Sequence, residues 1–440
     1  MKFIPLALFG AIISSAVMGT SPHILLILLL SICIITNICR MHDIFAHSAK
    51  LVVLFVVVIS VFLMPAYDIV ASRHGELSST DNVQILEFGA PLVLILSVAW
   101  YIFKPISYTK RRFRYRPKIF SDSLMITAFT IVFPISVFSY FVGLGRMGSA
   151  AVVLPFHLTG IFVFIQTKLM PALFVIYIEN KILRKKEINR NYFICYAVWS
   201  FLMTLVMLSK SIFVSNFIPL LIMLYLYYKP RRKTVVKFLI PIIAIFFFMY
   251  PVIGVMRLLH EDNRAMNISS IMEAAYEDEE NYEKSKNDNT LLKPLNRTFK
   301  TGAQLYYDYP IIKNDAFFDF SRMKMIMALG GSARYQTVVV EGYMETANHS
   351  SGTTGIMDPI LVGGKGLMYI TICIIMLFAA CVDRMYIKCQ FSVYAILIFF
   401  VFDLICNHNV SLIFEFTSLI VTLLSVCFAY YFNYRKMRLN

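Results

Sequence analysis

The sequence predicts an all-α polytopic membrane protein with about twelve transmembrane helices and one large periplasmic loop. Hydrophobic residues make up 58% of the 440 residues and charged residues only 15%. The mean hydropathy of +0.69 lies in the range of helical membrane proteins. The long apolar runs lack the alternation of an outer-membrane barrel strand, and helices satisfy their backbone polar groups within one segment. We therefore expect helices throughout the membrane.

The expected spans are apolar runs close to the ~20 residues that a bilayer requires. The first run resembles a signal peptide, but a second run follows almost at once, so we predict an uncleaved signal anchor. The spans lie at residues 3–18, 22–39, 50–69, 87–103, 121–144, 155–180, 192–208, 212–228, 238–256, 364–382, 391–406 and 411–431.

Alternate loops between these spans carry the positive charge. Basic residues cluster at 104–118, 181–190 and 229–237, and the positive-inside rule makes these loops cytoplasmic. The same phase predicts a bacterial inner-membrane protein with both termini in the cytoplasm. Attraction of these clusters to anionic headgroups accounts for the net charge of +15, so we predict no nucleic-acid partner.

The phase of the loops also defines the domain organisation. Residues 1–256 form a membrane domain with helices 1–9, and residues 257–363 form the large periplasmic loop. Residues 364–440 return to the membrane as helices 10–12 and end in a cytoplasmic tail. The loop is acidic and polar at first, and aromatic and aliphatic residues return from Leu291, so we expect its second half to be ordered.

The sequence lacks the common catalytic motifs of soluble enzymes. The sequence contains no phosphate-binding glycine loop, no zinc-protease motif and no hydrolase nucleophile elbow. All eight cysteines lie in or beside apolar runs without metal-type spacing. We predict no disulfide, no metal site and no cofactor.

Two cations lie in short loops on the predicted outer face. An activated sugar donor there is usually a polyprenyl-linked phosphate or pyrophosphate, because nucleotide sugars and ATP are absent. Lys210 lies in a turn between two apolar helices, at the depth of such a headgroup; the alternative is a lysine that snorkels from a helix end. Arg146 lies in a loop whose glycines let the backbone approach a ligand.

Three further charged residues lie within predicted spans. Lys168 is near the middle of its span, where a charge is either functional or paired with a buried partner. Asp403 and Glu415 flank the outer turn at 407–409. An apolar setting raises the pKa of a carboxyl group, which can then accept a proton from a sugar hydroxyl. The alternative role for each is an ion pair with Lys168 or Lys210.

The large loop holds a further set of candidates among aromatic residues that could stack on sugar rings. The alternative is an aromatic loop core with solvated cations. The candidates are Arg297, Arg322, Arg334, Tyr335 and His349.

Several of these residues resemble a known family. Lys210 and the helix that follows, Ser211 to Ile218, resemble the motif of O-antigen polymerases of the Wzy type. The glycine-rich stretch from Ser351 to Gly366 resembles the end of that family's large loop. Arg322 and Arg146 match its loop arginines. Lys210-Ser211 stands where many members have Arg-Gly, and no Trp-Pro pair follows Arg322.

The resemblance implies a metal-independent glycosyltransferase that moves the growing glycan from polyprenyl pyrophosphate onto an incoming lipid-linked repeat unit. Arg146, Lys210 and Arg322 would neutralise the leaving pyrophosphate. Asp403, Glu415 or His349 would orient or deprotonate the acceptor hydroxyl. The resemblance further implies a fold similar to membrane glycosyltransferases of the GT-C type and a co-polymerase that regulates chain length.

Two other functions remain open. An O-antigen ligase shares the architecture and would depend more on His349. A flippase or transporter of lipid-linked oligosaccharides belongs to another class, although transporters tend to have repeats and short loops.

Overall fold

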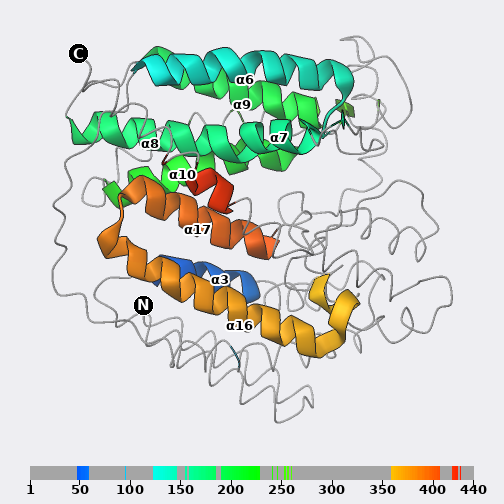
Figure 1. The fold of residues 1–440 in the computed structure, drawn as a ribbon, viewed down its shortest axis with the longest axis vertical. Coiled ribbons are helices and arrows are strands. Elements are labelled where there is room, and N and C mark those ends of the chain that lie inside the picture. The colour runs from blue at the N-terminus through cyan, green and yellow to red at the C-terminus, as the bar shows by residue number, and fades with distance from the viewer. Residues whose placement is uncertain are drawn as a thin grey trace. The chain divides into compact units, whose positions relative to one another are not determined.

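The computed structural model describes residues 47–58, 122–145, 158–184, 190–227 and 358–406, with shorter pieces at 154–155, 252–259 (in part) and 419–424. Every element in these residues is a helix (Figure 1). The chain divides into two compact units. Unit 1 contains α3 (Ser48–Val58), α16 (Asp358–Lys388) and the part of α17 (Phe391–Cys406) from Phe400 onward. Unit 2 contains the helices between residues 113 and 286 together with residues 389–399.

The helices fit an all-α membrane protein. Among the described residues, three helices are long and apolar enough to cross a membrane, at Asp122–Val142, Leu158–Leu183 and Tyr369–Tyr386. Asn191–Met207, Ser215–Tyr227 and Phe391–Ile405 are apolar but shorter. These helices coincide with predicted spans. The predicted spans 3–18 and 22–39, and nearly all of the predicted loop, lie outside the described residues.

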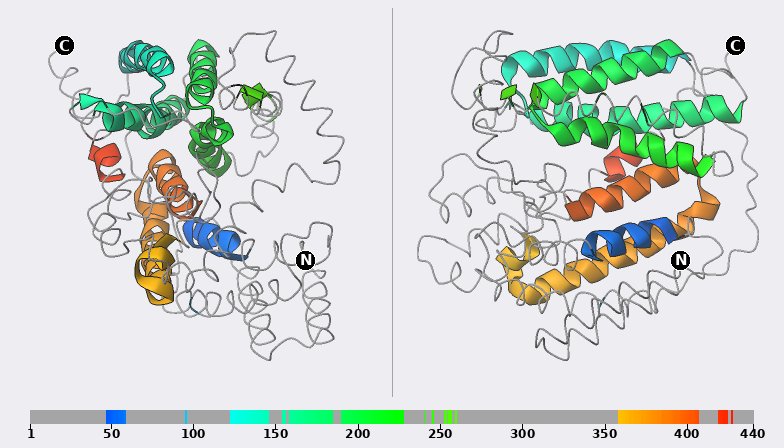
Figure 2. Two further views of the ribbon diagram at one scale, coloured as in Figure 1. Left: turned by 90° about the vertical axis from the view of Figure 1, so that its right-hand side faces the viewer. Right: turned by 180° about the vertical axis from the view of Figure 1, so that it is seen from behind.

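Unit 2 is built from helices that pack in a closed ring. α6 (Asp122–Val142) packs against α9 (Arg190–Met207) and α8 (Met170–Leu183), and α10 (Lys210–Tyr227) packs against the same two helices. Figure 2 shows this group from two further sides. Helices of this kind associate through close packing and internal hydrogen bonds, because lipid offers no hydrophobic gain on contact.

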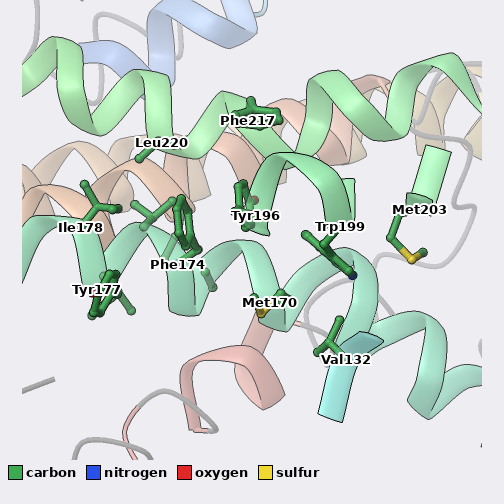
Figure 3. Packing of buried hydrophobic residues seen from close by; sticks show 14 of the residues in the cluster. Val132, Met170, Phe174, Tyr177, Ile178, Tyr196, Trp199, Met203, Phe217 and Leu220 are labelled. Atoms are coloured by element: carbon green, nitrogen blue, oxygen red, sulfur yellow. The ribbon is translucent and has the colours of Figure 1, made fainter. Parts of the chain in front are cut away.

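Aromatic side chains fill the centre of unit 2 (Figure 3). The rings of Phe174 on α8 and Tyr196 on α9 stack with centroids 3.8 Å apart and planes inclined by 3°. Phe217 of α10 meets Tyr196 edge to face at 5.3 Å. The hydroxyl of Tyr196 donates to the carbonyl of Asn216 at 2.7 Å, so the buried ring carries no unpaired donor. The stack thus joins α8, α9 and α10.

A π-helical turn interrupts the second long span. α7 (Leu158–Phe164) continues through η4 (Ile165–Leu169) into α8, and the N–H of Met170 donates to the carbonyl of Ile165. Pro171 follows directly. The helix continues through this proline. The wider π turn relieves the clash that the proline ring would make with the carbonyl four residues earlier.

In unit 1, α16 packs against α3 and holds its first turn. Asp383 accepts a hydrogen bond from the N–H of Ala49 at 3.0 Å, and its other oxygen lies 3.9 Å from Lys50 Nζ. Both charged side chains are buried. A carboxylate suits this place, because the first N–H groups of a helix lack partners and carry partial positive charge.

α16 begins at Asp358, earlier than the expected start near residue 364. The glycine-rich stretch at 363–366 therefore lies inside this helix rather than before it. The pair Asp358-Pro359 explains the early start, since aspartate favours the beginning of a helix and proline favours its first turn.

A carboxylate of α8 caps α17 in unit 2. Glu179 accepts from the N–H groups of Phe391 and Ser392, at 2.9 Å each, and from the Ser392 hydroxyl. Nearby, Lys181 Nζ lies 2.6 Å from Asp122 Oδ1, to which Tyr177 donates its hydroxyl at 2.8 Å. All of these groups belong to helix ends predicted to be cytoplasmic. The packing thus groups these ends as the loop charges predict.

Removing the cap should destabilise the protein. Glu179→Ala strands the two N–H groups and a buried hydroxyl, so we expect a loss of about 2–4 kcal/mol. The matched control is Asp122→Asn, which keeps an acceptor for Tyr177 and removes a charge from a carboxylate that is 51% exposed. We expect it to cost less than about 1 kcal/mol. Thermal unfolding of the purified protein in detergent measures both, and equal melting temperatures would contradict the role of Glu179.

Candidate functional site

The end of α6 that is predicted to face outward closes in a glycine turn. The N–H of Leu144 donates to the carbonyl of Ser139 at 2.9 Å, and the N–H of Gly143 donates to that of Tyr140 at 3.3 Å. This pair of bonds is a Schellman motif, which requires a left-handed residue after the helix. Gly143 supplies it with φ of 73°, and Gly145 follows with φ of 69°. We call Gly143–Gly145 the α6 turn.

The turn between α9 and α10 uses the same motif without a glycine. Ser209 donates its N–H to the carbonyl of Thr204, and Leu208 donates to that of Leu205, at 3.3 and 3.4 Å. Leu208 holds the left-handed position with φ of 47°. This conformation is strained for a residue with a side chain. α10 begins at the next residue, Lys210, which is therefore the first residue of the helix and not part of the turn, and which lies two residues before the predicted span. We call Leu208–Ser209 the α9–α10 turn.

These two turns meet at one end of unit 2. A Cβ atom added to Gly145 would lie 3.4 Å from Cε of Met207, the last residue of α9, and 3.5 Å from Cγ2 of Val163 in α7. Arg146 is the residue after Gly145, and Lys210 lies just beyond the α9–α10 turn. Gly145 of the α6 turn therefore lies against the last residue of α9, directly before the α9–α10 turn.

Polar side chains are buried within about two helical turns of this end. Gln166, on η4, donates its amide to Ser136 and Ser139 of α6, and Trp199 of α9 donates its indole N–H to Ser136. All four side chains are buried. None of these four residues was predicted from the sequence as a candidate, although a glutamine inside an apolar span indicates interhelical hydrogen bonding.

A second polar contact lies between α9 and α10. Asn216, fully buried, donates its amide to Ser200 Oγ at 3.1 Å, and its own Oδ1 has no hydrogen-bond partner among the residues that the structure describes. Asparagine was equally visible in the sequence as a polar residue within a span. The two contacts make this part of the core more polar than the aromatic stack.

Two other predicted residues fall in described helices. Lys168 lies on η4 and is partly buried. Asp403 lies near the end of α17, is only 4% exposed and belongs to unit 1, whereas both turns belong to unit 2. The remaining candidates lie outside the described residues: Arg146, Arg297, Arg322, Arg334, Tyr335, His349 and Glu415.

No protein-family model, curated protein sequence or solved structure matches this chain. Functional interpretation therefore depends on its own residues and their geometry.

The contact at Gly145 predicts a difference between two glycine-to-alanine substitutions. In Gly145→Ala the added methyl group occupies a left-handed residue and presses on Met207, so we expect a loss of about 1–2 kcal/mol. Gly160→Ala is the control, because Gly160 lies in α7 with no atom within 4 Å of the added Cβ. Alanine there should be neutral or stabilise by up to about 1 kcal/mol. Melting temperatures in detergent that fall equally, or not at all, would contradict the described turn.

Proposed function

We propose that the protein is a polymerase of polyprenyl-pyrophosphate-linked oligosaccharide repeat units, such as those of O-antigen or a related surface polysaccharide. The observation that carries this proposal is the meeting of the α6 turn and the α9–α10 turn at one end of unit 2. Each turn leads directly into a cation, Arg146 or Lys210. A lipid pyrophosphate in the outer leaflet would be neutralised by cations that follow these two turns.

The backbone around Lys210 favours an anion as well. Lys210 is the first residue of α10, so its N–H group lies at the positive end of the helix dipole. The Schellman bonds of Leu208 and Ser209 fix the chain immediately before it. A lysine held in this way needs little reorganisation when charge develops on the leaving group, which is the condition for electrostatic catalysis.

The proposed reaction is a glycosyl transfer without a metal. The bond between the sugar C1 and the pyrophosphate oxygen of the growing chain breaks, and a bond from C1 to the acceptor hydroxyl oxygen forms. Lys210, Arg146 and Arg322 stabilise the departing pyrophosphate. Asp403, Glu415 or His349 takes the hydroxyl proton.

Other parts of the proposal concern the whole chain. About twelve spans, a fold similar to GT-C glycosyltransferases and cytoplasmic termini would place residues 257–363 in the periplasm with the substrates. Arg297, Arg334, Tyr335 and Lys168 would then bind the glycans or their lipid carriers. A chain-length co-polymerase would be the protein partner.

The test is a knockout in the source strain, complemented with variants and analysed by gel electrophoresis of the surface polysaccharide. Lys210→Ala should leave a core band with one repeat unit and no ladder, because the pyrophosphate loses its cation. Lys210→Arg should keep a ladder, since it preserves the charge. Lys229→Ala is the control, because Lys229 lies just beyond the opposite end of α10.

The other candidate functions give different gels. Loss of all surface repeats in the knockout, including the single-repeat band, would indicate a ligase or flippase. An intact ladder in the knockout would overturn the proposed function altogether.

A further inference from the structure

The hydrogen bonds around Gln166 connect three segments of unit 2. Gln166 Nε2 donates to Ser136 Oγ at 3.3 Å and to Ser139 Oγ at 3.2 Å, and Ser139 Oγ lies 3.5 Å from Gln166 Oε1. Trp199 Nε1 donates to Ser136 Oγ at 3.2 Å. Ser136 gives its own hydrogen to the carbonyl of Val132 at 2.8 Å. With two bonds accepted and one donated, the Ser136 hydroxyl is fully satisfied. We call Gln166, Ser136, Ser139 and Trp199 the glutamine network.

The glutamine network is joined directly to the α6 turn. Ser139 accepts from Gln166 with its side chain, and with its carbonyl it accepts the N–H of Leu144. Ser139 thus belongs to both sets of hydrogen bonds. A displacement of Ser139 relative to η4 therefore also displaces the bond from the Leu144 N–H to the Ser139 carbonyl, which closes the turn. Arg146 follows this turn within two residues.

The same network reaches the α9–α10 turn through α9. Met203, about one helical turn beyond Trp199, brings its sulfur to 3.2 Å from Ser136 Oγ. Met207, one turn further, packs beneath Gly145. The spacing of α6 and α9 at their outer ends is thus determined by a polar contact above the aromatic stack.

A purely apolar contact would restrict the distance between α6 and α9 less closely than these hydrogen bonds do. Leucine and methionine side chains can slide past one another with little change in energy, whereas hydrogen bonds weaken steeply when distance and angle change. In a medium of low dielectric the penalty for an unpaired amide is larger still. The glutamine network therefore acts as a rigid spacer between α6, η4 and α9.

The π turn contributes to this arrangement. η4 begins at Ile165, directly before Gln166, and its extra residue per turn changes the direction in which the following side chains point. π turns are frequently found at functional sites. Here the turn presents a buried glutamine to α6.

We propose that Gln166 is a positioning residue, which acts through Ser139 and through Ser136, the acceptor that it shares with Trp199, to hold the α6 turn and the α9–α10 turn at the separation needed for one pyrophosphate. This inference rests on the proposed function, because it assigns the two turns to one ligand. The geometric part, that Gln166 controls both turns, is independent of the ligand.

Hydrogen exchange of the purified protein in detergent tests the geometric part. Gln166→Leu removes the amide but keeps an apolar side chain of similar length. We expect exchange at Leu144 and Ser209, whose N–H groups close the two turns, to become about tenfold faster. The control is Thr130→Val, because the exposed Thr130 hydroxyl bonds to the carbonyl of Ile126 in its own helix, about 20 Å along α6 from the α6 turn. Exchange at wild-type rates in Gln166→Leu would overturn the inference, whatever the polysaccharide shows.

A double variant separates positioning from stability. Gln166→Leu leaves Ser139 without its side-chain partner, and Gln166→Leu with Ser139→Ala removes both polar groups, which should restore the melting temperature and the amount of protein in the membrane. The polysaccharide ladder should still be lost in the double variant, while Thr130→Val keeps it. A ladder that returns together with stability would overturn the positioning role.

The two proposals fail in different ways. An intact ladder in Lys210→Ala would overturn the proposed function even if Gln166→Leu loosens both turns. A normal ladder in Gln166→Leu, with Lys210→Ala inactive, would overturn the positioning role alone.

Discussion

A backbone group that leaves a helix in apolar surroundings must find another partner at once, and this constraint shapes the end of unit 2 where the candidate site lies. α6 and α9 both meet it with a Schellman motif, in which the last free carbonyls accept N–H groups from the turn itself. The motif demands a left-handed residue. Its consequence is a pair of short, internally bonded turns, and the chain positions that follow them are fixed by the helices.

At the other end of unit 2, charged side chains of α8 and α6 satisfy the constraint. Glu179 binds the free N–H groups of α17, and Lys181 pairs with Asp122. In unit 1, Asp383 does the same for α3. Carboxylates thus accept the N–H groups at the starts of α3 and α17 that lack partners within their own helix. At the turns that follow α6 and α9, the closing groups are backbone atoms instead.

Hydropathy and loop charge predicted the described helices well, because both depend on the average composition of long segments. α9 and α10 begin and end within two residues of the predicted spans. The start of α16 was predicted late, since the Asp358-Pro359 signal is local and lies in a polar stretch. The π turn before Pro171 is a local feature as well, and hydropathy does not show that such a turn can accommodate the proline ring.

The candidate site was predictable only in part. Loop phase placed Arg146 and Lys210 on one side of the membrane, but hydropathy contains no information about which outer loops touch. That proximity follows from the packing of Gly145 on Met207. The glutamine network was not predicted for a similar reason. Serine, glutamine and tryptophan occur in many membrane spans, and the sequence does not show which residues on other helices are their hydrogen-bond partners.

Leucine at position 208 is the least expected choice in either turn. A left-handed φ costs a residue with a side chain about 1–3 kcal/mol, and glycine would avoid this strain. The Leu208 side chain is only 1% exposed, however, so its close packing in the core offsets part of this strain. The leucine thereby anchors the turn to the core by its side chain, which a glycine could not do. Strain offset by packing restricts the turn to one conformation, and an electrostatic site that must neutralise a leaving group gains from a cation whose backbone does not move.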